Sequence, residues 1–375
     1  MKVGIITDPM DTESSVRVYL NNLIENLFQL YDPGQIYLIH ARKSDNPLYR
    51  QGNEIILPGL YRDKAPSASL ADVFRPFLLR KYKLDVIHYT HSNPPLTFFA
   101  TGSKNVCLIT TIGAATHPQY YSLPSRYMIK ISRLLNRRMN MIITETESEK
   151  KEIVKFLRLP EEKVRVISSG VDEIYKPLNN IDGIKNELSV KYEINSPYIL
   201  HIGAYRPVKN GPGLVRAFAQ LKKRGIEHKL VLVGKPSERF DEVLKLIKEL
   251  DLEDEVISTD YVPREDLPKF YNAATLFVLP SFKESFAHVL VETMACGCPV
   301  VTSNITCMPE IAGEAGILID PYDVNSLADG MYRILTDSQL RQNLRKKGLE
   351  RAKLFSWEKC ARETLEVYEE LHKKG

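Results

Sequence analysis

Short apolar runs alternate with helical patterns along the whole chain, and this alternation limits the fold more than any other feature. Runs typical of β-strands lie at Val3–Thr7, Gln35–His40, Glu54–Leu57, Asp85–Tyr89, Val106–Thr111, Met141–Thr144, Val164–Ser168, Tyr198–Ile202, Leu230–Val233, Glu255–Ser258, Leu276–Leu279 and Pro299–Thr302. Between the first two runs, Val16, Leu20 and Leu27 share one helical face. Strands that are apolar throughout and alternate with helices form parallel sheets covered on both sides. The sequence therefore predicts an α/β fold.

The length of the chain favours two domains. Its 375 residues are too many for one ordinary core and suit two cores of similar size. The alternation stops around Ser169–Ser196, where the chain becomes polar, and we place a linker near Tyr175–Ile181. A first domain over residues 1–178 and a second over 179–356 follow. Two doubly wound, Rossmann-like domains would then face each other across a cleft lined by the carboxyl ends of their strands.

The composition is typical of a soluble cytoplasmic protein. Apolar residues make up 43% of the chain, charged residues 26%, and no run of eighteen apolar residues is present. The opening stretch MKVGIITDPM lacks the basic and apolar regions of a secretion signal. The five cysteines are odd in number and show no zinc-binding spacing, which favours reduced thiols in the core.

Positive charge is concentrated in the first half of the chain. The net charge of +4 is too small to argue for nucleic acid as a partner. From Arg75 to Arg138, however, ten Lys and Arg residues accompany a single acid, Asp85. A helical stripe in this region contains Arg126, Lys130, Arg133 and Arg137. Such a stripe either contacts anionic lipid headgroups at the inner face of a membrane or is simply a solvated helix face.

Chemistry-bearing residues gather after the strand Leu276–Leu279. A helix is predicted from about Phe286 to Cys296, and Gly297 ends it. The amides at its start could hold a phosphate, since a helix N-terminus offers unpaired N–H groups. Glu284 and Glu292 lie eight residues apart and would address neutral hydroxyl groups beside that phosphate. As an isolated pair, they could equally be a helix cap and an ordinary helix residue.

The segment VLPSFKESFAHVLVETMACGCPVVTSNITCMPEIAGEAGILIDPYD resembles the signature of retaining glycosyltransferases of family 4. Those enzymes have the two-domain GT-B fold and carry E-x7-E at this place. The resemblance implies that Glu284 contacts the donor sugar and Glu292 the nucleotide ribose. The phosphates would meet the backbone of Phe286, Ala287, His288 and Val289. Ser285 departs from the glycine that usually follows the first glutamate.

Further segments extend the resemblance along the chain. HIGAYRPVKNGPGLVRAFAQL resembles the opening of the family's donor domain, where an Arg and a Lys neutralise the pyrophosphate. Lys209 takes the place of that Lys. Gly203 is followed by Ala204 instead of the usual Arg, so that Arg206 is the available substitute; a solvated loop is the alternative. The candidates beneath the nucleotide base are Tyr261 and Val262. The closing segment, residues 357–375, resembles a helix that crosses back onto the first domain, with Trp357 as its anchor.

The first domain departs more from the family. Ser14 and Ser15 replace glycines of the loop after the first strand, and they are candidates for contact with acceptor or phosphate. Gly113 stands where the family often has a His near the reacting centre. His117 could reach the same space, although a loop His is commonly a surface residue. His88 and His91 are further residues that could line the cleft, although each alone is more typical of a structural role.

The resemblance implies a retaining hexosyltransferase that moves a sugar from a UDP- or GDP-sugar to a glycan or lipid-linked acceptor. The enzyme would need no nucleophilic residue and no cofactor beyond the donor. Histidines and acids do not group at metal-ligand spacings, so no metal is expected. A nicotinamide enzyme is disfavoured because no G-x-G-x-x-G follows a strand. Two alternatives stay open: a sugar-nucleotide epimerase or hydrolase on the same fold, and a catalytically silent glycosyltransferase-like binding subunit.

Overall fold

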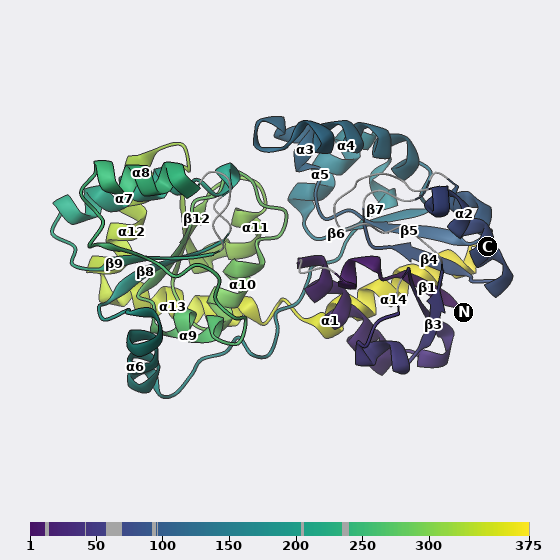
Figure 1. Cartoon of the computed structure of the whole chain (residues 1–375), viewed down its shortest axis with the longest axis horizontal. Coiled ribbons are helices and arrows are strands. Elements are labelled where there is room, and N and C mark those ends of the chain that lie inside the picture. The colour runs from purple at the N-terminus through teal and green to yellow at the C-terminus, as the bar shows by residue number, and fades with distance from the viewer. Residues whose placement is uncertain are drawn as a thin grey trace. The chain divides into compact units, whose positions relative to one another are not determined.

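The chain folds into two compact units. The structure, a computed structural model, describes residues 1–11, 15–41, 43–57, 70–91, 95, 97–203, 206–234 and 240–374. The first unit comprises Met1–Gly170 and Ser356–Gly375, and the second comprises Val171–Phe355. Each unit contains one parallel sheet with helices on both faces, as Figure 1 shows. The predicted α/β architecture with two Rossmann-like domains is confirmed.

The first sheet has seven described strands in the order β3-β2-β1-β4-β5-β6-β7. Their bounds are β1 Val3–Ile6, β2 Ile36–His40, β3 Asn53–Ile56, β4 Val86–Tyr89, β5 Lys104–Leu108, β6 Met141–Thr144 and β7 Val164–Val166. Every neighbouring pair is parallel. The order reverses between β1 and β4, and open α/β sheets bind ligands beyond the carboxyl ends of strands at such a point.

Two groups of helices cover the first sheet. One face packs against α1 (Ser15–Leu30) and α14 (Trp357–Lys373), through apolar residues such as Leu20, Leu23 and Tyr368. The other face packs against α2 (Leu70–Leu79), α4 (Leu123–Asn136) and α5 (Glu147–Leu157), through Leu79, Ile129 and Ile153. The four-residue helix α3 (Gly113–Thr116) precedes α4. Both faces are therefore buried, which explains why these strands are apolar throughout.

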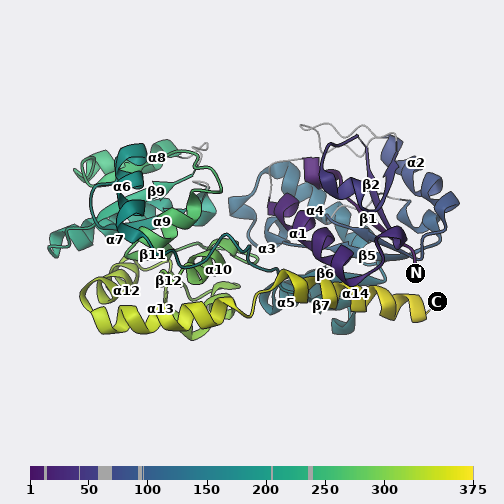
Figure 2. The same cartoon turned by 90° about the horizontal axis from the view of Figure 1, so that it is seen from below.

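Helix α14 comes from the far end of the sequence and completes the first unit. It lies along α1 in both views of the molecule (Figures 1 and 2). Trp357 is buried, and its ring meets that of Tyr19 edge-on at 5.8 Å. The Tyr368 hydroxyl lies 2.7 Å from Nδ1 of His88 on β4. A Cβ atom at Gly170 would lie only 2.2 Å from the backbone nitrogen of Trp357, so the start of α14 is packed directly onto a glycine.

The second sheet has six described strands in the order β10-β9-β8-β11-β12-β13, all parallel. The strands are β8 Tyr198–Ile202, β9 Lys229–Val233, β10 Val256–Ser258, β11 Leu276–Leu279, β12 Val300–Ser303 and β13 Gly316–Ile319. The order reverses between β8 and β11. The loops that follow these two strands are therefore neighbours at the carboxyl edge, although β9 and β10 lie between the two strands in the sequence.

Helices also cover both faces of the second sheet. One face packs against α6 (Ile181–Tyr192), α9 (Leu267–Ala273), α10 (His288–Ala295) and α11 (Met308–Ala312). The other packs against α7 (Gly211–Lys223), α8 (Phe240–Glu249), α12 (Val324–Thr336) and α13 (Ser338–Ala352). Each face has its own apolar core, so the second unit is built around one sheet with a core on either side.

Several boundaries differ from the sequence prediction. Strand β13 was not predicted; it is a short strand, Gly316–Ile319, that begins at a glycine. Strand β5 ends at Leu108, three residues before the predicted end. Helix α10 begins at His288 because Ala287 adopts a left-handed φ of 61°, which keeps Phe286 out of the helix. Gly297 follows the helix with a φ of 75°, consistent with the predicted stop.

All five cysteines are buried and none forms a disulfide, as predicted. In the part of the chain that the structure describes, none of the helices has the length and apolar character needed to cross a bilayer.

Candidate functional site

Lys209 and Glu284 meet at the carboxyl edge of the second sheet. Lys209 ends a short 3-10 turn that follows β8, and Glu284 lies in the loop that follows β11. Because β8 and β11 are adjacent strands, their loops converge. Lys209 Nζ lies 2.6 Å from Glu284 Oε1, and only 15% and 13% of the two side chains are exposed. The pair is thus a largely buried ion pair on the edge where such sheets bind ligands.

Neighbouring groups fix the position of this ion pair. The Ser281 hydroxyl donates a hydrogen bond of 2.6 Å to the same oxygen, Glu284 Oε1. The backbone of Phe282 donates to the carbonyl of Val208, which joins the two loops directly. Among the described residues, Glu284 Oε2 has no hydrogen-bond partner. One carboxylate oxygen is therefore committed to the protein and the other is available to a ligand.

His201 is buried close to this ion pair. It lies on β8, and its Nδ1 is 2.9 Å from the carbonyl oxygen of Val278 on β11. Burial lowers the pKa of His201 to about 4, and the positive charge of Lys209 acts in the same direction. The ring is therefore neutral near pH 7. Sequence reasoning missed His201, whose one available signal is its place near the end of an apolar strand.

Glu292 has a separate set of partners. It lies on α10, and its Oε2 accepts a hydrogen bond of 2.8 Å from the Tyr271 hydroxyl. Burial raises the pKa of Glu292, while the hydrogen bond from Tyr271 and the nearby charges of His288 and Arg264 oppose that shift. A carboxylate in this setting gains from each additional neutral hydrogen-bond donor.

Contacts continue from Glu292 to the beginning of the second unit. Tyr271 meets the ring of Tyr175 edge-on at 5.9 Å, and the Arg264 guanidinium lies 5.9 Å from the centre of that ring. Arg264 also donates to Asp172 Oδ2 at 2.8 Å. Sequence reasoning did not single out Tyr271, Tyr175 or Arg264. Asp172 lies within the polar stretch Ser169–Ser196, where the predicted alternation stops.

The start of α10 offers backbone groups rather than side chains. Phe286 and Ala287 are buried, and the Phe286 ring packs edge-on against Phe355 at 5.7 Å. His288 and Val289 form the first helical positions, where N–H groups point out of the helix end. These residues therefore suit the predicted role of anion binding through the backbone.

The remaining candidates in the second unit lie on the same edge of the sheet. A Cβ atom at Gly203 would lie 3.5 Å from Lys209 Cε, so this residue adjoins the ion pair. Arg206 is exposed and directly precedes the turn that carries Lys209. Beyond β10, the Tyr261 side chain is 66% exposed, whereas Val262 is buried in the core and faces a ligand only through its backbone.

In the first unit the candidates are less closely assembled. Ser14 lies outside the described residues, and Ser15 is the first residue of α1. His117 follows α3, with Nδ1 at 2.9 Å from the Thr116 hydroxyl, which donates to Glu152 on α5. His88 does not line a cleft: it is fully buried against α14, and burial lowers its pKa to about 3.

Tyr121 explains the absence of a side chain at position 113. A Cβ atom on Gly113 would lie 2.2 Å from the Tyr121 hydroxyl oxygen. The space in which a larger residue would begin is therefore already filled. Any side chain at this position would have to displace the end of the tyrosine.

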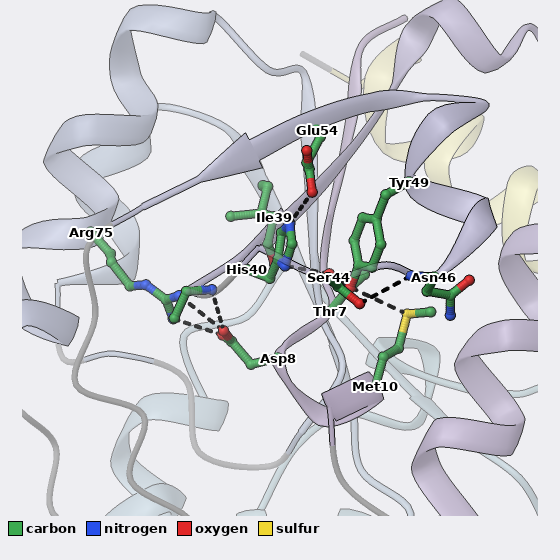
Figure 3. Close-up of polar contacts among 11 residues, drawn as sticks. Thr7, Asp8, Met10, Ile39, His40, Ser44, Asn46, Tyr49, Glu54 and Arg75 are labelled. Atoms are coloured by element: carbon green, nitrogen blue, oxygen red, sulfur yellow. Dashed lines mark hydrogen bonds and ion pairs between the residues drawn. The ribbon is translucent and has the colours of Figure 1, made fainter.

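A polar cluster at the carboxyl ends of β1 and β2 was also missed by the sequence analysis (Figure 3). Asp8 receives two hydrogen bonds from Arg75, of 2.7 and 3.0 Å, and another from the backbone of Ala41. Tyr49 stacks on His40 with ring centres 4.2 Å apart. The buried Asp8–Arg75 pair ties α2 to the end of β1. Strand β1 is one of the two strands between which the order of the first sheet reverses.

A metal centre is not evident in the described ranges, where no three His, Cys, Asp or Glu side chains gather closely enough to hold an ion.

Comparison with known proteins agrees with this architecture. The family model for "Glycosyltransferase Family 4" matches residues 16–174, and that for "Glycosyl transferases group 1" matches residues 185–351. The O-antigen chain mannosyltransferase B of Escherichia coli is 30% identical over 308 residues, which cover 78% of this chain and 80% of the relative.

Solved structures establish the same fold. A sucrose-phosphate synthase from Thermosynechococcus elongatus superposes with a TM-score of 0.78 at 22% identity, over 100% of both chains. Anabaena Alr3699/HepE, solved in complex with UDP and glucose, gives a TM-score of 0.79 at 19% identity, over 99% of this chain and 100% of that chain. The chain therefore belongs to glycosyltransferase family 4, and its two Rossmann-like units have the GT-B fold.

Proposed function

We propose that this glycosyltransferase takes a hexosyl unit from a UDP- or GDP-sugar and transfers it, with retention, to a hydroxyl group of a glycan or lipid-linked acceptor. The reaction would take place in the cytoplasm, at the inner face of the membrane. The observation that carries the proposal is the buried Lys209–Glu284 pair, which places a cation and a hydrogen-bond acceptor together at a ligand-binding edge. The mannosyltransferase relative and the UDP and glucose bound to HepE support the donor class.

Lys209 and Arg206 are proposed to neutralise the pyrophosphate of the donor. An ammonium group has three donors, and the contact of Lys209 with Glu284 uses one of them. Positive charge held at this point stabilises the leaving group as the glycosidic bond breaks. The backbone at the start of α10, from Phe286 to Val289, would contribute N–H donors to the same phosphates.

The two glutamates are proposed to bind the two ends of the donor. Glu284 Oε2 would accept a hydrogen bond from a hydroxyl of the sugar, since Oε1 is already occupied by Lys209 and Ser281. Glu292 would accept from the ribose, where a neutral donor relieves part of its desolvation. The base would lie near Tyr261 and the backbone of Val262.

Transfer is proposed to proceed without a nucleophilic residue or a metal ion. The bond between the anomeric carbon and the phosphate oxygen breaks while the acceptor oxygen bonds to the same face of that carbon. The acceptor proton passes to the departing phosphate. Gly203 would adjoin the donor through its backbone, and Ser14, Ser15 and His117 are proposed to serve the acceptor side.

A donor panel tests this proposal. UDP-, GDP-, ADP- and dTDP-sugars are compared by thermal stabilisation and by donor hydrolysis, with and without a chelator. We expect one nucleotide class to stabilise the protein and to be hydrolysed slowly, with no effect of the chelator. Glu284→Ala should abolish hydrolysis, whereas Glu314→Ala, a surface control that removes an ion pair with Lys347, should not.

Each contrary outcome identifies a different error. Binding without hydrolysis or transfer to any acceptor would favour the silent binding subunit. Binding that disappears with the chelator would overturn the metal-independent mechanism. If no sugar nucleotide binds, the proposed donor class is wrong.

A further inference from the structure

Helix α4 presents a stripe of large apolar side chains to solvent. Leu123, Tyr127, Ile131 and Leu134 are 74%, 67%, 37% and 70% exposed. At 100° per residue, these four positions fall within about 80° of the helix circumference. Four large apolar residues in one row exceed the scattered exposure usual on a protein surface, and such a patch marks an interaction site.

This stripe is not the side of α4 that packs on its own unit. Ile129, Ser132 and Asn136 are buried and lie on nearly the opposite side of the helix. Ile129 joins the core beneath the first sheet. Helix α4 therefore packs on the first unit through the side opposite the stripe.

Cations border the stripe along one side. Arg126, Lys130, Arg133 and Arg137 fall within about 60° of one another, directly beside the apolar row. Helix α4 has no acidic residue, and the sequence from Lys104 to Thr144 contains neither Asp nor Glu. The charges that α4 and its bordering cations carry are therefore all positive, and the next acids in the sequence lie between residues 145 and 152.

A second group of exposed aromatic residues lies on the same side of the first unit. Phe74 and Phe77 of α2 are 59% and 52% exposed, and Phe99, in the 3-10 turn Phe98–Thr101 that contacts α2, is 59% exposed. Helices α2 and α4 cover the same face of the first sheet. Both helices that cover this face thus carry exposed apolar side chains.

We propose that α4 binds the surface of an anionic phospholipid bilayer, with its stripe at the boundary between headgroups and acyl chains. An apolar row with a tyrosine, bordered by Lys and Arg, is typical of helices that lie in this interface. The bordering cations have no acidic residue among them on the helix, so they complement a uniformly anionic surface. The purpose of this contact rests on the proposed function: it brings the enzyme to a lipid-linked acceptor at the membrane surface.

Vesicle co-sedimentation of the full chain tests the proposal. One vesicle preparation contains phosphatidylcholine alone, and the other also contains phosphatidylglycerol. We expect binding to the anionic vesicles that falls as salt is added. Tyr127→Glu combined with Leu134→Glu should weaken this binding by at least about tenfold, since each change places a charge in the apolar boundary. Leu244→Glu, at a 42% exposed position on α8, is the matched control.

Charge reversal separates the electrostatic part of the membrane interaction from the apolar part. Lys130→Glu combined with Arg137→Glu should also weaken binding about tenfold, because each cation near an anionic surface contributes. Lys346→Glu, on the exposed side of α13, should bind like the unmodified chain. Equal binding to neutral and anionic vesicles, or stripe variants that bind normally, would overturn the proposal, as would binding of the stripe to another protein instead of lipid.

Hydrolysis of the soluble donor, measured without vesicles, keeps this test independent of the proposed function. The α4 variants should hydrolyse the donor at the unmodified rate, which also shows that they are folded. If no donor is hydrolysed yet the vesicle result holds, the proposed reaction fails while the membrane contact stands. If hydrolysis is intact and vesicles are not bound, only the membrane proposal fails.

Discussion

Lys209 Nζ and Glu284 Oε1 lie 2.6 Å apart although 75 residues separate them in the sequence. The pair is largely buried, so water compensates either charge poorly if the other is removed. Removing one partner of a buried pair costs far more than removing both, since it leaves an unpaired charge in a poorly solvated site. This asymmetry allows stability and catalysis to be measured separately at one pair.

Lys209→Met should lower both stability and activity. We expect the free energy of unfolding to fall by about 3–5 kcal/mol, as is typical for a broken buried pair. The catalytic efficiency kcat/KM should fall by about 10²–10³, the usual cost of removing one transition-state donor. Denaturant unfolding and donor turnover measure the two effects.

The double variant Lys209→Met, Glu284→Gln should recover much of the stability but none of the activity. Lys347→Met, which removes an exposed pair with Glu314, is the control and should change neither quantity appreciably. Unimpaired turnover by Lys209→Met would contradict the role proposed for the lysine.

Glu292→Gln should stabilise the second unit while weakening donor binding. The folded pKa of Glu292 is raised, so its contribution to stability is present at low pH and is lost as the pH rises through that pKa. Near about pH 7 the buried carboxylate is therefore a cost that glutamine removes. We expect a higher melting temperature at about pH 7 and a difference that narrows toward about pH 4.

Thermal unfolding across that pH range and titration with the donor measure both effects. Glu253→Gln, on an exposed stretch after α8, is the control and should melt like the unmodified chain. A lower melting temperature at neutral pH would show that Tyr271 and Arg264 outweigh the burial of Glu292.

Two glycine-to-alanine changes should have opposite effects on stability. At Gly170 the new Cβ would lie 2.2 Å from the Trp357 nitrogen and 2.6 Å from its Cγ, so backbone must move. We expect a loss of about 1–3 kcal/mol or more from overpacking. At Gly348, inside α13, the nearest atoms belong to Met294 at 3.5 Å, which is ordinary contact. Alanine there should gain about 0.5–1 kcal/mol.

Chemical denaturation of both glycine variants measures the difference. If Gly170→Ala unfolded like the unmodified chain, the close packing of α14 on this residue would be wrong.

His88 should make the first unit less stable in mild acid. Its folded pKa of about 3 lies below the ordinary 6.5, so the unfolded chain takes up the proton first. Stability present above about pH 6.5 is then lost as the pH falls toward 3. Between those limits the slope from one such group is about 1.4 kcal/mol per pH unit.

Replacing His88 should remove its contribution to the dependence of the free energy of unfolding on pH. We expect His88→Phe to show a flatter dependence than the unmodified chain when unfolding is measured in urea at several pH values from about 4 to 6. Identical slopes would mean that His88 does not titrate differently on unfolding. His201, in the second unit, contributes a similar slope of its own down to its pKa of about 4.

The sequence predicted most of the fold because parallel strands buried on both faces leave continuous apolar runs. It also singled out Lys209 and Glu284, through local motifs on two different loops. Their pairing was not predictable, since it depends on the adjacency of β8 and β11. The start of α10 was misplaced because the left-handed conformation of Ala287 has no signature in its residue type.

Residues that act through distant contacts were missed altogether. Tyr271, Arg264 and Asp172 reach Glu292 or one another from separate segments, and none of them belongs to a recognisable local pattern. His88 was considered for a cleft because it lies near the end of the predicted strand Asp85–Tyr89. Only the packing of α14 reveals that a helix from the end of the chain covers it. Long-range packing of this kind is set by the whole fold rather than by any local window.

The contribution of α14 to the first unit has a consequence for biosynthesis. Residues 1–170 leave the ribosome with one face of their sheet lacking the helix that covers it, and the entire second unit is made before that helix appears. Until then, the apolar partners of Trp357 and Tyr368 on α1 and β4 lack their native cover. The nascent first unit is therefore the stage at which this enzyme is most exposed to aggregation and most in need of a chaperone.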